Sequence, residues 1–317
     1  MNRRTMLVAA AVALLGFAAP AMAQYPDKPV NVIVGFAAGG GTDSYGRGLS
    51  KVSEKHLGQP MIIVNKPGGS SIPAAAEVSQ APPDGYTLFL SSHGGLIIND
   101  LKKDLVVDPI DGFDYVGVVG GLTTGVYVPI NSPYQNLDEL VAAIEANPGA
   151  LRWGHTGRGA GHHTAGVGFL VKNDLEAQDV PFKGGAPTRA ALIGEQVDFS
   201  FMGAHLITGF EDQMRQLGVA NDERLSSIPD IPTIPELGYD YVGVLSPITL
   251  LAPKGTDPAI ITNLGEAVEQ MVADPDYQAF MSQSSLPVFH LGPEEAKALA
   301  EKSKSDWAPI IELTGAS

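Results

Sequence analysis

Two glycine-rich turns, each between an apolar run and a helix-like segment, most constrain how this chain can fold. The first run, Val30–Val34, leads into Gly39-Gly40-Gly41, and a helix is expected over residues 44–57. The second run, Leu151–Gly154, leads into HTGRGAGHHTAGVGF, which continues into another helix. A strand that ends in a glycine-rich turn before a helix commonly holds an anion on backbone N–H groups. Two such turns facing one cleft would hold a small anion between two helix N-termini.

The first turn does not match the known phosphate-binding patterns. Gly35 and Gly40 have the spacing of a Walker A loop, but Gly41 stands where lysine is required, and the dinucleotide fingerprint GxGxxG does not match either. The serine-hydrolase elbow GxSxG does not occur. Two interpretations remain: a purely structural turn, or a nest of backbone N–H groups for a carboxylate. Asp43 is expected to cap the helix or order the turn rather than to act as a base.

Strand-like and helix-like segments alternate along the chain, which predicts an α/β fold. The expected strands are residues 30–34, 61–64, 86–91, 115–119, 126–128, 151–154, 180–182, 197–202 and 248–253. The expected helices are residues 44–57, 72–80, 137–146, 188–193, 259–273 and 293–313, with one more after the second glycine-rich turn. Asn136 is the expected cap of the helix over 137–146.

The N-terminus has the features of an export signal. Arg3 and Arg4 precede an uncharged apolar run, Leu7–Ala19, and Ala21-Met22-Ala23 fits a signal-peptidase site. The run is too short to span a bilayer. We expect residues 1–23 to be a signal peptide cleaved after Ala23, and the mature protein to be periplasmic. Both a plain secretory leader and a twin-arginine signal remain open.

Composition narrows the possible partners. The chain has no cysteine, so it must rely on apolar burial rather than on disulfides. Its 35 acidic residues outnumber 20 basic ones, for a formal charge of −15. This balance argues against nucleic acid or an anionic membrane surface as a partner. Any attraction for an anion must therefore be local, from backbone N–H groups and helix ends.

Five of the seven histidines lie just beyond expected strands: His93, His155, His162, His163 and His205. His155, His162 and His163 could converge on a metal, but no carboxylate is visible near them in sequence, so no metal site is predicted. No nucleophile can be paired with a histidine, so no catalytic residue is assigned. The histidines are expected to donate hydrogen bonds to ligand oxygens. Arg158 is either a solvated side chain or a partner for a ligand carboxylate.

Eight short strings resemble one protein family. They are YPDKPVNVIVGFAAGGGTD, LGQPMIIVNKPGG, APPDGYTLFL, ANPGALRWG, VPFKGGAPT, GEQVDFSF, IPDIPTIPELG and LLAPKGT. In this order, from Tyr25 to nearly the C-terminus, they resemble the periplasmic receptors of tripartite tricarboxylate transporters, of the Bug or TctC type.

The resemblance implies a two-domain periplasmic-binding-protein fold of the Venus-flytrap kind. Each domain would be a mixed sheet flanked by helices, with two crossing strands as the hinge. Domain 1 would comprise residues 24–126 and 247–317, and domain 2 residues 127–246. The crossings are expected near Gly125–Val128 and Leu245–Ile248.

The resemblance also implies a carboxylate held by two loops, here residues 36–43 and 156–163. Compared with the family pattern, hydroxyls are lost at Ala160 and Gly161. Met202 stands where receptors for amino acids can carry an aspartate. This favours a dicarboxylate or an aromatic carboxylate without an amine. The residues expected to contact the ligand are Phe36, Ala37, Gly39, Gly40, Gly41, Thr42, Asp43, Ser92, His93, Thr156, Gly157, Arg158, Gly159, Ala160, His162, His163, Lys183, Gly184 and Met202.

The sequence thus predicts a solute-binding protein that delivers a small organic carboxylate to the membrane permease of a tripartite tricarboxylate transporter. It is expected to be a monomer, to use no cofactor and not to be an enzyme. Two alternatives remain: a ligand sensor that acts on a signalling protein, and a two-domain enzyme.

Overall fold

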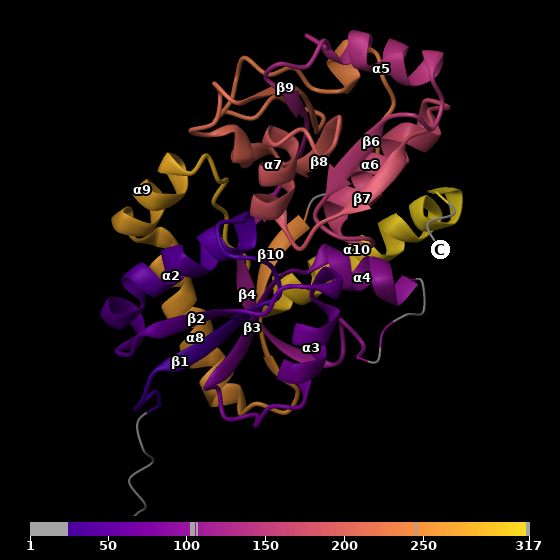
Figure 1. The fold of residues 1–317 in the computed structure, drawn as a ribbon. Helices are drawn as coiled ribbons and strands as arrows, with labels where there is room; N and C mark the ends of the chain where they lie inside the picture. The colour runs from indigo at the N-terminus through magenta and orange to yellow at the C-terminus, as the bar shows by residue number, and fades with distance from the viewer. Residues whose placement is uncertain (1–24, 102–104, 106, 245, 315–317) are drawn as a thin grey trace, which may run out of the picture.

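The computed structural model describes residues 25–101, 105, 107–244 and 246–314, and it contains two lobes, each built on its own sheet (Figure 1). The expected signal peptide, residues 1–23, lies outside the described residues. Among the helices of the described part of the chain, none combines the length and the apolar character needed to cross a membrane.

The first lobe contains a five-stranded mixed sheet. Its strands, in spatial order, are β2 (Met61–Asn65), β1 (Val30–Val34), β3 (Thr87–Ser92), β10 (Ser246–Pro253) and β4 (Phe113–Leu122). The first three are parallel, and Val32 pairs with Ile63 and Leu88. β10 is antiparallel to both of its neighbours. The central strands are almost wholly apolar because helices cover both faces of the sheet.

Helices form a layer on each face of this sheet. One layer contains α2 (Gly41–Leu57), α8 (Pro258–Ala273) and α9 (Pro275–Gln283). The other contains the short helix η2 (Gly69–Ser71) with α3 (Ile72–Ser79), α4 (Gly94–Leu101) and α10 (Pro293–Thr314). Tyr45 and Leu49, four residues apart on α2, are fully buried against Val268 and Met271 of α8 in the first core.

The second lobe repeats the strand arrangement of the first. Its strands, in order, are β7 (Gln178–Pro181), β6 (Arg152–His155), β8 (Phe199–Gly203), β5 (Thr124–Pro129) and β9 (Met214–Ala220). α5 (Leu137–Ala146) and α6 (Gly161–Lys172) contribute to one apolar core, whereas α7 (Gly185–Ile193) and η3 (Ala204–Ile207) contribute to the other. A further short helix, η4 (Pro235–Leu237), packs at the edge through Leu237.

The chain changes sheets at Thr123, because β4 ends at Leu122 and β5 begins at Thr124. The expected domain boundary after residue 126 therefore falls within β5. The return crossing was expected over residues 245–248; β10 begins at Ser246, and residue 245 lies outside the described residues. In both sheets the parallel strands end toward the same region, which is where α/β sheets bind ligands.

The two-domain α/β architecture with mixed sheets is confirmed, and so is Asn136 as the cap of α5, since its side chain accepts from Glu139 N. Two α-helices and one strand were not predicted, α4, α9 and β9, nor were the short helices η2, η3 and η4. α4 starts at Gly94-Gly95 and α9 at Pro275, residue types that indicate turns. β9 carries Arg215 and Gln216, which interrupt its apolar pattern.

Asp274 joins two helices of the first lobe. It is 4 % exposed, caps α9 by accepting from Asp276 N, and accepts from Lys55 Nζ at 2.6 Å and His56 Nε2 at 2.7 Å, at the end of α2. The hydrogen bond from Lys55, followed by that from His56, holds the pKa of the Asp274 carboxyl below its usual range.

We expect Asp274→Ala to lower the melting temperature by a few degrees at neutral pH, measured by calorimetry. A carboxyl with a lowered pKa in the folded state stabilises the protein above its unfolded pKa of about 3.9, and this contribution fades as the pH falls below that value. The difference in melting temperature between the variant and the wild type should therefore narrow below about pH 4. Asp230→Ala, at an exposed position, is the control; an equal loss in both variants would contradict the prediction.

Candidate functional site

A small cavity of about 30 Å³ lies where strands of the two lobes end. The loops that follow β1 and β6 lead to it, as do the ends of β3 and β8. Its lining residues are Phe36, Gly40, Gly41, Thr42, Ser92 and Leu122 from the first lobe, and Thr156, Ala160, Gly161, His162, Gly185, Gly203, His205 and Leu206 from the second. This volume admits a water molecule or two, far less than an open ligand pocket.

Three helices begin at this cavity. α2 starts at Gly41, α6 at Gly161 and α7 at Gly185, and all three residues line it. None of the three has a side-chain cap, whereas Asn136, Asp257 and Asp274 cap helices elsewhere in the molecule. The first N–H groups of a helix have no partner within it, and the helix dipole adds partial positive charge there. The cavity is therefore suited to an anion.

The lobes touch around the cavity. Ala37 N donates to Lys183 O at 3.1 Å, Asn99 Nδ2 donates to Gly159 O at 3.2 Å, and Ser70 Oγ donates to Arg158 O. Each of these bonds joins the first lobe to a loop of the second. The two lobes are therefore in direct contact through these loops beside the cavity.

A second pocket of about 240 Å³ adjoins the cavity and shares Phe36 and Thr156 with it. Its other lining residues are Gly68, Gly69, Ser70, Gly157, Arg158, Pro181, Phe182 and Lys183. We call it the outer pocket.

The structure brings many of the predicted residues together and places others elsewhere. Those at the cavity are Phe36, Gly40, Gly41, Thr42, Ser92, Thr156, Ala160 and His162. Those at the outer pocket, besides the two shared residues, are Gly157, Arg158 and Lys183. Those lining neither are Ala37, Gly39, Asp43, His93, Gly159, His163, Gly184 and Met202. Ligand contact by any of them stays a prediction.

Asp43 orders the first loop. Its carboxylate is almost fully buried and accepts from Gly39 N at 2.8 Å, from Arg47 Nε at 2.7 Å and from Asn65 Nδ2 at 3.0 Å. Because these bonds engage both of its oxygens, the side chain holds the turn rather than facing the cavity. The expectation that Asp43 orders the turn is confirmed.

His93 and Met202 line neither the cavity nor the outer pocket. His93 Nε2 lies 3.1 Å from Tyr115 Oη, and burial lowers the pKa of His93 to about 4. Met202 is fully buried in β8 and packs in the core beside Tyr127 and Leu206. Each side chain therefore packs within its own lobe, His93 in the first and Met202 in the second.

Arg158 has a partner within the protein. Its Nε donates to Asp179 Oδ2 at 2.7 Å and its Nη2 to Oδ1 at 3.1 Å, a two-pronged pair on the exposed edge of the second lobe. These hydrogen bonds are the main reason that the pKa of Asp179 is lowered to about 2. Asp179 is the carboxylate that sequence reasoning did not place near the histidines, because β7 brings it alongside β6.

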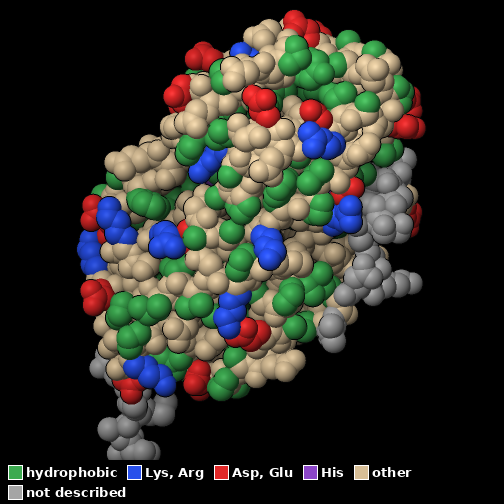
Figure 2. All heavy atoms as spheres, viewed as in Figure 1, with side chains coloured by type: hydrophobic (Ala, Val, Ile, Leu, Met, Phe, Trp, Pro, Cys, Tyr) green, Lys and Arg blue, Asp and Glu red, His purple; other side chains and the backbone are tan. Residues whose placement is uncertain are grey.

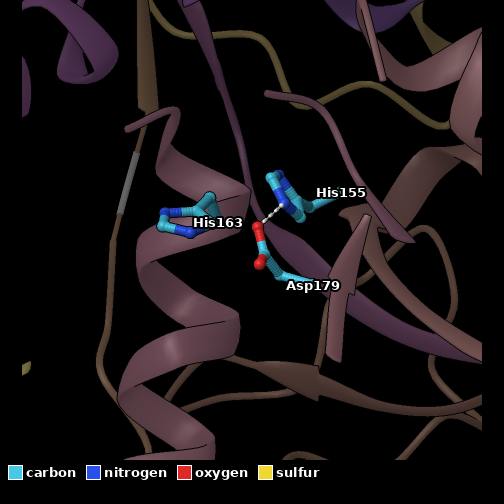
Figure 3. A group of neighbouring side chains, drawn as sticks. All are labelled: His155, His163 and Asp179. Atoms are coloured by element: carbon cyan, nitrogen blue, oxygen red, sulfur yellow. Dashed lines mark hydrogen bonds and ion pairs between the residues drawn. The ribbon is translucent and has the colours of Figure 1, made fainter. Parts of the chain in front are cut away.

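His155, His163 and Asp179 converge closely enough to resemble a metal site (Figure 3). His155 Nε2 lies 3.2 Å from Asp179 Oδ2, while Nδ1 of His155 accepts from Gly157 N and Nδ1 of His163 from Gly159 N. A metal-bound histidine needs one bare nitrogen and normally donates from the other. Here Nδ1 of each ring already accepts, which leaves Nε2 to carry the proton. The donor set therefore fits hydrogen bonding better than metal ligation.

The expected contact residues did not include six lining residues: Leu122, Gly161, Gly185, Gly203, His205 and Leu206. Gly161 nevertheless lies in the expected loop 156–163, and His205 is one of the histidines expected to donate hydrogen bonds to the ligand. Gly161 and Gly185 follow directly on residues that were predicted, so the glycine runs themselves were the available signal. Leu122 and Leu206 are apolar residues that only the packing of the two lobes brings to the cavity.

The cavity is positive through its backbone rather than through lysine or arginine. Within the described part of the chain, no Lys or Arg lines it. Burial lowers the pKa of His162 to about 4 and that of His205 to about 3, so both rings are neutral near pH 7. Helix N-termini favour this neutral form.

A family model described as "Tripartite tricarboxylate transporter family receptor" matches residues 46–316. The chain belongs to this receptor family. It is 31 % identical to the UPF0065 protein in the gbd 5′ region of Cupriavidus necator, over 99 % of this chain and 98 % of that one. The resemblance seen in the sequence is therefore confirmed.

Two solved structures are similar to this chain in fold and in sequence. The periplasmic binding protein BugD superimposes with a TM-score of 0.86 at 28 % identity, covering 92 % of this chain and 99 % of its own. MatC from Rhodopseudomonas palustris, with bound malate, gives 0.82 at 27 % identity over 90 % of this chain and 100 % of its own. The relatives of this receptor are thus solute-binding proteins.

A side chain at Gly41 would meet two residues that line the cavity. A Cβ there would lie 2.6 Å from Leu122 Cδ2 and 2.8 Å from His205 Cε1. We expect Gly41→Val to abolish ligand binding, measured by calorimetric titration, because the branched side chain would occupy the start of α2. Gly292→Ala is the control, since its Cβ would meet only Glu295 Oε2, at 4.0 Å. Unchanged affinity in Gly41→Val would contradict the assignment of the cavity.

Proposed function

We propose that this protein is a periplasmic receptor that captures a small organic carboxylate between its lobes and delivers it to the permease of a tripartite tricarboxylate transporter. The observation that carries this proposal is the meeting of three uncapped helix N-termini at one cavity. They supply N–H donors and partial positive charge for an anionic group, without any metal or cofactor.

The enclosed end of the ligand is a carboxylate without an amine. Among the lining residues of the described chain there is no Asp or Glu, so an ammonium group would find no charged partner. The nearby carboxylate of Asp43 is already engaged by three donors. The malate bound to MatC, a relative in this family, carries carboxylates and no amine.

The rest of the ligand extends into the outer pocket, because the cavity is too small for a whole organic acid. Lys183 and Arg158 could pair there with a second carboxylate, and Phe36 and Phe182 could pack against an aromatic ring. Figure 2 shows Lys and Arg side chains across the middle of this face, between the lobes. They attract an anion locally although the whole molecule is acidic.

The site needs no chemistry to perform this role. The hydrogen bond between Thr124 Oγ1 and His162 Nδ1, 2.8 Å long, resembles a nucleophile–base pair, but Thr124 does not line the cavity. An enzyme is therefore less well supported than a receptor. A sensor would bind the same ligand and would differ only in its partner: deletion would abolish a transcriptional response rather than uptake of the ligand.

A thermal-shift screen of organic acids tests the function. We expect malate, succinate, adipate or benzoate to raise the melting temperature by several degrees at saturation, because a ligand bound only by the native state stabilises it. Aspartate and lysine are the matched controls with an amine and should give smaller shifts. If none of the acids stabilises the protein, the proposed function is wrong.

Lys183→Met tests where the second charge lies. We expect it to lower the affinity for adipate about three- to tenfold, because only adipate brings a second charge to the outer pocket. The affinity for hexanoate, which has the same length and one carboxylate, should stay nearly unchanged. Lys172→Met, at an exposed position on α6, is the matched control. If the affinities for adipate and hexanoate fall equally, the second carboxylate does not lie in the outer pocket.

A further inference from the structure

His205 brings an unused hydrogen-bonding atom to the cavity. Its Nε2 is buried and has no hydrogen-bond partner among the described residues, and the side chain lines the cavity. A buried nitrogen without a partner lowers the stability of a fold, so such atoms are uncommon in native structures. We therefore expect the missing partner of Nε2 to be a ligand in the cavity that the ring lines.

The imidazole lies across the boundary between the lobes. His205 belongs to η3, which follows β8 of the second lobe. A Cβ built on Gly203 would lie 2.4 Å from its Cε1, and one built on Gly41 would lie 3.1 Å from its Nε2. Gly41 is the first residue of α2 in the other lobe. The unpartnered nitrogen therefore sits beside an uncapped helix N-terminus, where an anion would be held.

The surroundings keep His205 neutral. Burial is the main cause of its lowered pKa, followed by the charges of His162 on α6 and Arg189 on α7. Arg189 is directed elsewhere, since Nη1 donates to Leu206 O at 3.4 Å and the guanidinium stacks on Phe210.

The remaining groups near the ring add no free charge. Tyr127 on β5 donates its hydroxyl to Gly203 O and Ala204 O. On α2, the Asp43 carboxylate is paired with Arg47. Among the described residues no acidic group therefore stabilises an imidazolium, and His205 offers one N–H donor and no charge.

We propose that His205 is a specificity-determining ligand contact, which donates from Nε2 to a carboxylate oxygen of the enclosed end group while the helix N-termini bind the same group. This rests on the proposed function and deepens it. An anionic oxygen can only accept, so Nε2 carries the proton. The site then selects end groups that offer acceptors alone, and it rejects amines and alcohols that would need an acceptor in return.

Two substitutions separate the effect of the hydrogen-bond donor from the effect of the volume of the ring. His205→Gln keeps an N–H donor on a side chain of similar reach, whereas His205→Leu keeps the bulk and removes the donor. His290→Gln is the matched control, because that ring bonds Val118 O away from the cavity. The melting temperature of each ligand-free variant is measured first, and His205→Leu should match or exceed the wild type because the unpartnered nitrogen is gone.

Calorimetric titrations with malate, succinate, adipate and benzoate then test the contact. We expect His205→Leu to weaken the best of these probes by about ten- to a hundredfold, and His205→Gln to stay within about fivefold of the wild type. If both variants bind like the wild type, or both lose affinity equally, the proposal is overturned while the proposed function stands. If no probe binds the wild type, both are wrong.

The nitrogen-15 spectrum of the histidine rings gives a test that needs no ligand. At pH 7 the signals absent from His205→Gln should be those of a neutral ring protonated at Nε2. An imidazolium, or a ring protonated at Nδ1, would overturn the proposal.

Discussion

The backbone N–H groups at the start of a helix must find acceptors, and this requirement governs the centre of the molecule. Asn136, Asp257 and Asp274 satisfy it for α5, α8 and α9 with their own side chains. α2, α6 and α7 begin at residues whose neighbours offer no such cap, and they begin at the same place. A bound anion or a water molecule can accept from these N–H groups, so the three helix starts together form a place suited to a ligand.

Two loop glycines let the lobes approach each other closely around this cavity. A Cβ on Gly184 would lie 3.2 Å from Ala37 N, and one on Gly159 would lie 2.5 Å from the Asn99 amide. Both glycines have positive φ, a conformation that other residues rarely adopt. The same residues therefore shape the turns and permit close contact between the lobes. Replacing them would change closure as well as local conformation.

Sequence patterns were sufficient for the α/β class and for two of the three helix N-termini, because a strand, a glycine run and a helix lie consecutively in each half. The third, at Gly185, follows a short and partly exposed strand and so gave a weaker signal. The side-chain partners could not be predicted, since they depend on neighbours in space. Arg158 reaches Asp179 only because β6 and β7 are adjacent, and His205 reaches Gly41 only because the lobes meet.

The position of β10 has a consequence for the order in which the molecule can form. It lies between β3 and β4, yet it follows the whole second lobe in the chain. The sheet of the first lobe therefore has a gap until residues 246–253 have been synthesised, and closing it requires contacts between segments far apart in sequence, which form slowly. A newly made chain consequently remains incompletely folded until most of it has been produced.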